Sequence, residues 1–194
     1  MKFTEKVKER ISRFILNAVI KNNESYPQLK GELFIKAYDT SEDGKLVYRY
    51  HHSNVIVNTA SILISRLLKN NSEPAAGIAY LALGEGSSDW DIQDPPAPNT
   101  SKSLLEQEIC RKSIDASTFI DPESGEPTTA HTNIVDYCVT LGEAEGVGPI
   151  VEMGLFGGDA TEAMNSGTMI NWRTFPVINK TNTMIVTIVF RIKA

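Results

Sequence analysis

The clearest indication of the fold class is the stretch MIVTIVFRI, residues 184–192. Every second side chain from Val186 to Ile192 is large and apolar, whereas the alternate set from Ile185 to Arg191 is mixed. Side chains of a β-strand point to opposite faces with a period of two, so this pattern predicts a strand with one strongly apolar face. We therefore expect the last part of the chain to pack as a strand against a hydrophobic core.

Strand signals of the same kind recur upstream. Asp43-Gly44 is a strong hairpin signal between two of these stretches, and Gly77 begins a nearly continuous apolar run typical of a buried strand. The remaining connections are rich in glycine, proline and acidic residues, which favour surface loops. The predicted strands upstream of residue 184 are 32–38, 46–50, 54–57, 77–83, 114–120, 132–141, 150–156 and 168–175.

Two short helices interrupt this pattern. Residues 59–69 place apolar side chains at helical spacing, and residues 103–111 follow the cap candidates Thr100 and Ser101. Many short strands with few helices predict a mainly β fold. We expect a β-sandwich or distorted barrel of short antiparallel strands, with an N-terminal amphipathic helix and two short helices.

The N-terminal helix is predicted from apolar residues at three- and four-residue steps, while its opposite face is mostly basic. We divide the chain into a helical arm (1–23), a linker (24–31) and a β-rich body (32–194). The helix either packs on its own body or serves as an assembly arm that docks on another subunit; a membrane-surface helix is a weaker third reading, because glutamates interrupt its basic face. The predicted contact residues of the arm are Val7, Ile11, Phe14, Ile15 and Val19.

The charge distribution is uneven along the chain of 194 residues. The net charge is −5, but residues 1–30 carry +4, residues 31–83 carry 0, residues 84–165 carry −13 and residues 166–194 carry +4. No stretch reaches the roughly 18 apolar residues of a membrane span, and the start does not read as a secretory signal. Without a basic patch interleaved with aromatics, binding to nucleic acid is not expected.

Candidate chemistry in the sequence is sparse. Gly84-Glu85-Gly86 follows a strand but lacks the Lys and Ser/Thr of a phosphate loop. Asp89, Trp90 and Asp91 form an acidic loop that could bind a ligand, although the calcium-loop spacing fails. His51 and His52 are expected at the surface, and we read the two cysteines as separate buried thiols. We therefore predict no catalytic residues, no metal ligands and no cofactor.

Five local patterns occur in a fixed order along the chain. They are NVIVNTA (54–60), IAYLALGEG (78–86), a Leu…Glu…Arg segment ending at Arg111, IVEMGLF (150–156), and a segment from Gly167 to Lys180 that contains Arg173 and Phe175. This order resembles a family of bacteriophage tail structural proteins of the baseplate, collar or tail-fibre-attachment type, also found in phage-tail-like contractile particles. The resemblance covers about residues 31–192. It departs from the family at Glu85, where a small residue is more common, and residues 3–20 fall outside it.

The resemblance implies a structural, non-enzymatic protein that acts by protein–protein assembly. It implies a homo-oligomer, a trimer or hexamer, that contacts other tail proteins, is part of the virion tail and assembles in the host cytoplasm without membrane insertion. The alternatives are a receptor- or glycan-binding module at a tail tip and, more remotely, a glycan-degrading enzyme. From the residues themselves we predict a structural ion-pair cluster of Glu108, Arg111, Glu152 and Arg173.

Overall fold

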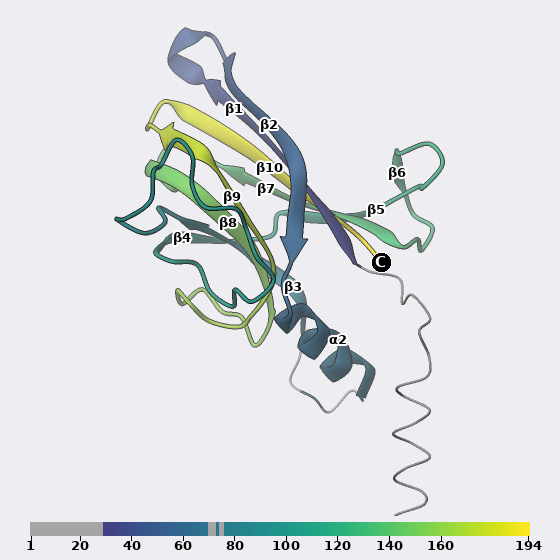
Figure 1. The fold of residues 1–194 in the computed structure, drawn as a ribbon. Helices are drawn as coiled ribbons and strands as arrows, with labels where there is room; N and C mark the ends of the chain where they lie inside the picture. Colours follow the sequence, from purple (N-terminus) through teal and green to yellow (C-terminus); the bar gives the residue numbers. More distant parts are fainter. Residues whose placement is uncertain (1–28, 70–72, 74–75) are drawn as a thin grey trace, which may run out of the picture.

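The C-terminal stretch forms β10 (Met184–Lys193), between β1 (Lys30–Asp39) and β7 (Ile134–Leu141). Its predicted apolar face is in the core, since Val186, Ile188 and Phe190 are at most 1% exposed. The computed structural model describes residues 29–194 apart from 70–72 and 74–75, and over this part the protein is mainly β (Figure 1). The predicted arm and residues 24–28 of the predicted linker lie outside the described residues.

The other elements follow one another with short connections, apart from the long loop between β3 and β4. They are η1 (Thr40–Glu42), β2 (Lys45–Ile56), α2 (Thr59–Lys69), β3 (Ala76–Gly84), β4 (Glu108–Ser113), β5 (Ala116–Ile120), β6 (Pro127–Thr128), β8 (Gly148–Gly158) and β9 (Thr168–Lys180). The helix predicted at 59–69 is confirmed. The strands predicted at 46–50 and 54–57 are parts of one longer strand, β2.

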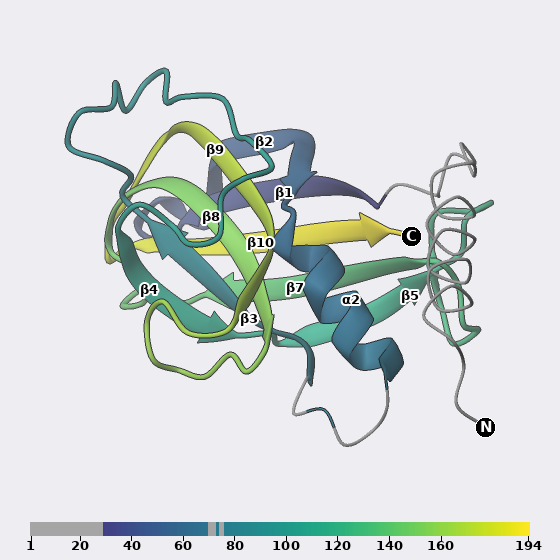
Figure 2. The same cartoon turned by 60° about the horizontal axis from the view of Figure 1, so that its bottom comes forward.

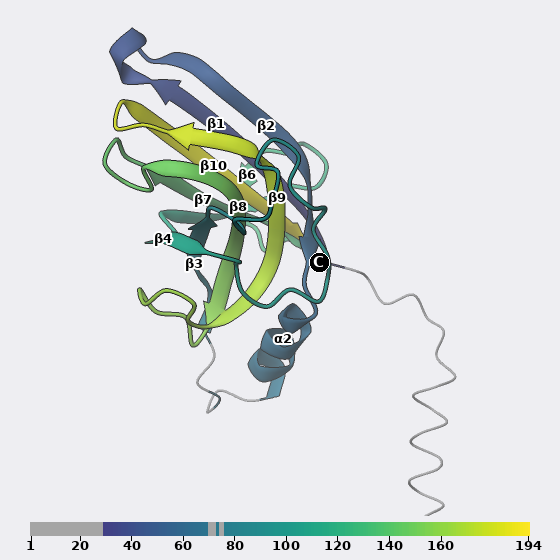
Figure 3. The same cartoon turned by 60° about the vertical axis from the view of Figure 1, so that its left-hand side comes forward.

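The described strands form one open antiparallel sheet of ten, in the order β4-β3-β8-β9-β2-β1-β10-β7-β5-β6. The expectation of a mainly β, antiparallel fold is confirmed, whereas one open sheet takes the place of the expected β-sandwich or distorted barrel. The two halves of the sheet meet where β2 and β9 share only two residue pairs, Val55 with Trp172 and Ile56 with Asn171. The sheet bends strongly, as Figure 3 shows, and side chains from both halves fill one core. The bend gives sandwich-like packing without two separate sheets.

The strand order requires the two ends of the sheet to approach each other. β4 is the first strand of the sheet and β5 the ninth, yet only Ile114 and Asp115 separate them in sequence. No ladder joins β4 to β7 in the described part of the chain, and side chains bridge this seam instead. Lys112 Nζ donates to the Thr140 carbonyl (2.8 Å), and the Asp115 carboxylate accepts from the Thr140 amide (2.7 Å). These contacts satisfy edge groups that would otherwise be open to another chain.

The helix predicted at 103–111 is not formed. Residues 103–107 belong to the loop, and β4 begins at Glu108. The amides of Glu106 and Gln107 donate to the carboxylate of Glu152, while β4 pairs with β3. Tertiary partners for the backbone thus outweigh the local helical spacing.

Asp115→Ala tests the seam. We expect the free energy of unfolding to fall by less than about 1 kcal/mol, because one surface hydrogen bond is lost. Hydrogen exchange measured by NMR should nevertheless accelerate at the Thr140 amide, whose acceptor is removed. Glu123→Ala, which changes another exposed loop carboxylate, is the control and should alter neither quantity. Unchanged exchange at Thr140 in the first variant would show that Asp115 does not hold the seam.

Candidate functional site

The outer face of the half-sheet β4-β3-β8-β9 is covered by two irregular loops, residues 85–107 and 159–167. A second apolar cluster lies beneath them; it is centred on Phe156 and Trp172 and includes Leu105 from the first loop. Strand β8 is consequently buried on both faces, which explains why its sequence is apolar almost throughout. Long ordered loops of this kind are a common location for binding surfaces.

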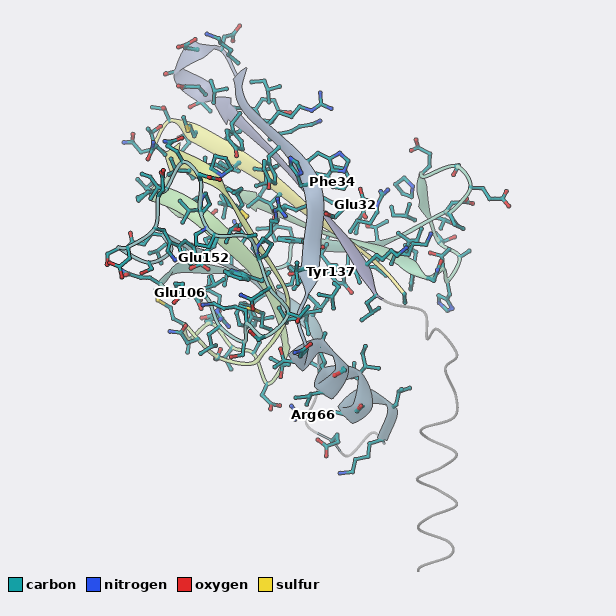
Figure 4. The ribbon with its side chains drawn as sticks, in the orientation of Figure 1. Glu32, Phe34, Arg66, Glu106, Tyr137 and Glu152 are labelled. Atoms are coloured by element: carbon teal, nitrogen blue, oxygen red, sulfur yellow. The ribbon has the colours of Figure 1, made fainter. Side chains whose placement is uncertain are left out.

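Glu152 holds the first loop against the sheet. Its carboxylate is fully buried and accepts hydrogen bonds from Trp172 Nε1 (2.8 Å), the Glu106 amide (2.8 Å) and the Gln107 amide (3.3 Å). Figure 4 shows the Glu106 and Glu152 side chains close together at this edge of the body. Burial raises the pKa of Glu152 above its ordinary value, although the three donors and nearby Lys102 act in the opposite direction.

The glycines around Glu85 make this packing possible. A Cβ atom on Gly84 would lie 2.5 Å from Glu152 Oε1, too close for any other residue without displacement of the carboxylate. Gly86 has φ +74°, and a Cβ there would lie 2.6 Å from the Trp90 ring. The two glycines therefore serve close packing and a left-handed turn.

The predicted ligand residues are split between the interior and the solvent. Trp90 is half-buried and packs on Trp172, with ring centroids 6.3 Å apart. Asp89 and Asp91 are exposed, and the Asp91 carboxylate accepts from the Gln93 amide within the loop. Across residues 29–194, gaps aside, no group of three His, Cys, Asp or Glu side chains is placed to hold a metal ion. Trp90 thus anchors the loop to the body.

Glu108 and Arg111 hold the second loop. The two side chains are 0% and 1% exposed, and Arg111 Nε lies 2.6 Å from Glu108 Oε1. Arg111 also donates to the Ser166 carbonyl (2.7 Å), while Glu108 accepts from the Asn165 amide (2.8 Å). The guanidinium stacks over Phe156, 4.4 Å from the ring centroid. This buried pair is fully hydrogen-bonded, which is the condition under which buried charges are tolerated.

A β-bulge brings this pair together. Residues three apart on a regular strand point to opposite faces. The register between β3 and β4 shifts between Leu83 and Gly84, so that Leu83 pairs with Cys110 and Gly84 with Glu108. The extra residue on β4, Ile109, allows Glu108 and Arg111 to share one face.

The four-residue cluster predicted from the sequence is only half formed. Glu108 and Arg111 pair as expected, whereas Glu152 takes Trp172 and two amides as its partners. Arg173 lies next to Trp172 on β9 and points to the other face of the sheet, where its Nε donates to the Tyr50 hydroxyl (2.8 Å). The cluster is corrected to one ion pair and two separate anchors.

Lys180 is a buried anchor that the sequence analysis did not single out as a site residue. It is 2% exposed, and its ammonium donates to the carbonyls of Gly142 (2.7 Å) and Glu143 (3.1 Å). Burial lowers its pKa, because the charged form loses hydration. Lys180 lies between the polar residues Asn179 and Thr181, so the local sequence gives no signal that its side chain is buried.

A different kind of surface occurs at the end of the body where α2 lies, which Figure 2 brings forward. The helix buries Ala60 and Leu63 against the body, but its outward side keeps large apolar residues in solvent. Their exposed fractions are 54% for Ile62, 40% for Ile64, 48% for Leu67 and 80% for Leu68. Such a cluster on one helix is typical of an interaction surface.

No protein-family model matches the chain, and no curated protein is significantly similar to it. Within the described residues, no helix is long and apolar enough to cross a membrane.

Arg111→Ala should destabilise the protein strongly. It leaves the buried carboxylate of Glu108 without its cation, so we expect a loss of about 3 kcal/mol or more in the free energy of unfolding, measured by chemical denaturation. Lys45→Ala breaks an exposed ion pair with Glu42 and serves as the control, with an expected change below about 0.5 kcal/mol. Equal stability of the two variants would contradict a structural role for the buried pair.

Glu152→Gln should alter the pH dependence of stability. Because the folded pKa lies above the ordinary value of 4.5, folding favours the protonated acid. That contribution is fully present below about pH 4.5 and is lost as the pH rises through the folded pKa. The melting temperature of the wild type should therefore fall relative to Glu152→Gln between pH 4 and pH 8. The exposed-residue control Glu123→Gln should show no such trend, and a constant difference for Glu152→Gln would contradict the raised pKa.

Proposed function

We propose that this chain is a structural, non-enzymatic component of a bacteriophage tail or tail-like particle, of the baseplate, collar or fibre-attachment kind. It acts by protein–protein assembly as a homo-oligomer, a trimer or hexamer, within the virion tail after assembly in the host cytoplasm. The observation that carries this proposal is the exposed apolar surface of α2. It lies on a body whose two long loops, 85–107 and 159–167, are held in place by buried polar side chains.

The loop anchors support an assembly role in physical terms. Glu152 fixes loop 85–107 and the Glu108–Arg111 pair fixes loop 159–167, so both loops present a defined surface. Preorganised loops lose little conformational entropy when they meet a partner, and this raises affinity for a given contact area. The anchoring residues also lie in the motifs on which the family resemblance rests.

A receptor- or glycan-binding role at a tail tip has less support. Sugar binding commonly uses an exposed aromatic face beside polar groups, whereas Trp90 packs against Trp172 and is half-buried. The buried carboxylate of Glu152 already accepts three hydrogen bonds, which suits an anchor more than an acid or base in catalysis. Assembly is therefore the better-supported function.

The solution mass of the purified full chain tests this proposal. We expect light scattering to give three or six times the chain mass of 21.4 kDa. Increasing the salt to about 0.5 M should shift the equilibrium toward smaller species, because basic ends and an acidic middle attract each other across copies.

A second measurement locates the protein within the tail particle. Labelled chain should appear at a fixed position in images of intact tail particles assembled in its presence. A chain that stays monomeric at all salt concentrations and never enters particles would overturn the proposed function.

A further inference from the structure

An open groove runs along one flank of α2. It has a volume of about 620 Å³. Its lining is mostly apolar, from Leu29, Ile56, Val57, Ala60 and Ile64, together with the polar residues Asn58, Ser61 and Thr100. Leu68 lies one helical turn beyond Ile64, on the same flank, and is 80% exposed. A continuous apolar strip on a helix beside a mostly apolar groove is the usual shape of a site that receives an amphipathic helix.

The chain itself enters this groove. Leu29 is the first described residue and lines the groove directly before β1 begins at Lys30. The 28 residues that precede Leu29 are therefore joined to the body beside the groove. Their number is sufficient for a helix of 18 residues and a connection of eight, residues 21–28, that could span roughly 26 Å when extended.

The buried side chain of Asn54 lies in the same part of the β1–β2 ladder, although it does not line the groove. Asn54 pairs with Gly31 across β1 and β2. Ile56 lies two residues after Asn54, and Leu29 lies two residues before Gly31. It is 8% exposed, and neither its amide oxygen nor its nitrogen has a hydrogen-bond partner among the residues that the structure describes. A buried amide of this kind is costly, so this end of the β1–β2 ladder is less well satisfied than the rest of the sheet.

The N-terminal segment has the pattern that such a groove receives. Residues 3–20 carry apolar side chains at helical spacing, from Val7 through Phe14 to Val19, and a mostly basic opposite face. Residues 1–28 hold six basic and three acidic side chains, whereas residues 29–194 hold 13 basic and 21 acidic ones. The segment and the body therefore attract each other electrostatically.

We propose that residues 3–20 of one copy dock in the α2 groove of a neighbouring copy. This inference rests on the proposed function, since it requires that copies meet. Each copy offers one segment and one groove, so the exchange is head-to-tail, and a head-to-tail contact that closes produces a ring. In such a ring the neighbouring groove is presented at a high effective concentration, which compensates for a short contact.

Cysteine cross-linking between two tagged forms of the full chain tests the exchange. In a background with Cys110→Ala and Cys138→Ala, one form carries Phe14→Cys and the other Ile64→Cys, and the two are co-expressed. We expect a disulfide-linked dimer that contains both tags. Leu46→Cys in place of Ile64→Cys is the matched control, because Leu46 is 46% exposed but lies at the start of β2, away from the groove; it should give no dimer.

A single chain that carries both Phe14→Cys and Ile64→Cys separates exchange from fold-back. Disulfide-linked multimers, whether linear or closed into a ring, support the inference. A disulfide confined to the monomer would show that the segment occupies its own groove, and this overturns the inference.

Leu68→Asp supplies an independent test that does not depend on cross-linking. Because this side chain is 80% exposed, the body should keep its melting temperature, while self-association should weaken by about tenfold. Val147→Asp, at another half-exposed apolar position, is the control and should leave association unchanged. If Leu68→Asp and the wild type have the same oligomeric mass, the groove is not the interface, although the proposed assembly function stands. If the wild type is monomeric, the proposed function fails first.

Discussion

The burial of β8 on both faces determines how the loops and the two halves of the sheet are arranged. One face of this strand points into the core between the two halves of the sheet, and the other is covered by loops 85–107 and 159–167. The loops that cover β8 bring backbone amides into a buried environment, where an unpaired polar group is costly. Each loop is therefore attached through a buried charged side chain that pairs with these amides. Glu152 and the Glu108–Arg111 pair thus convert two irregular segments into fixed parts of the body.

Local patterns predicted the elements well where the pattern and the environment agree. The alternation in β10 corresponds to the face that is buried. The helical spacing in α2 correctly predicts a helix, although only Ala60 and Leu63 of its apolar side chains are buried. Residues 103–111 were misassigned because the partner of their amides, Glu152, lies some 46 residues further along the chain. No local rule contains that information.

The candidate site shows the same division. Glu108 and Arg111 were expected to pair on a helix, and they pair on a strand only because a bulge at Ile109 changes the face of one residue. Glu152 and Arg173 are both charged residues in apolar surroundings, yet they point to opposite faces of neighbouring strands. Which face each residue takes follows from the register, which is set by many pairs at once. The open groove beside α2 was likewise invisible, because residues 29 and 56 are brought together only by the β1–β2 ladder.

The pairing of β1 with β10 has a consequence for how copies of the protein are made. Lys30 pairs with Lys193, so the strand that begins the described body finds one of its neighbours only after β10 has been synthesised. Long-range pairing of this kind is slow and becomes available late, after the intervening strands have left the ribosome. A chain that stops before β10 lacks the strand that joins β1 to β7 and leaves both edges open. The topology thus acts as a length check, since only chains translated through β10 can present a finished surface to their neighbours.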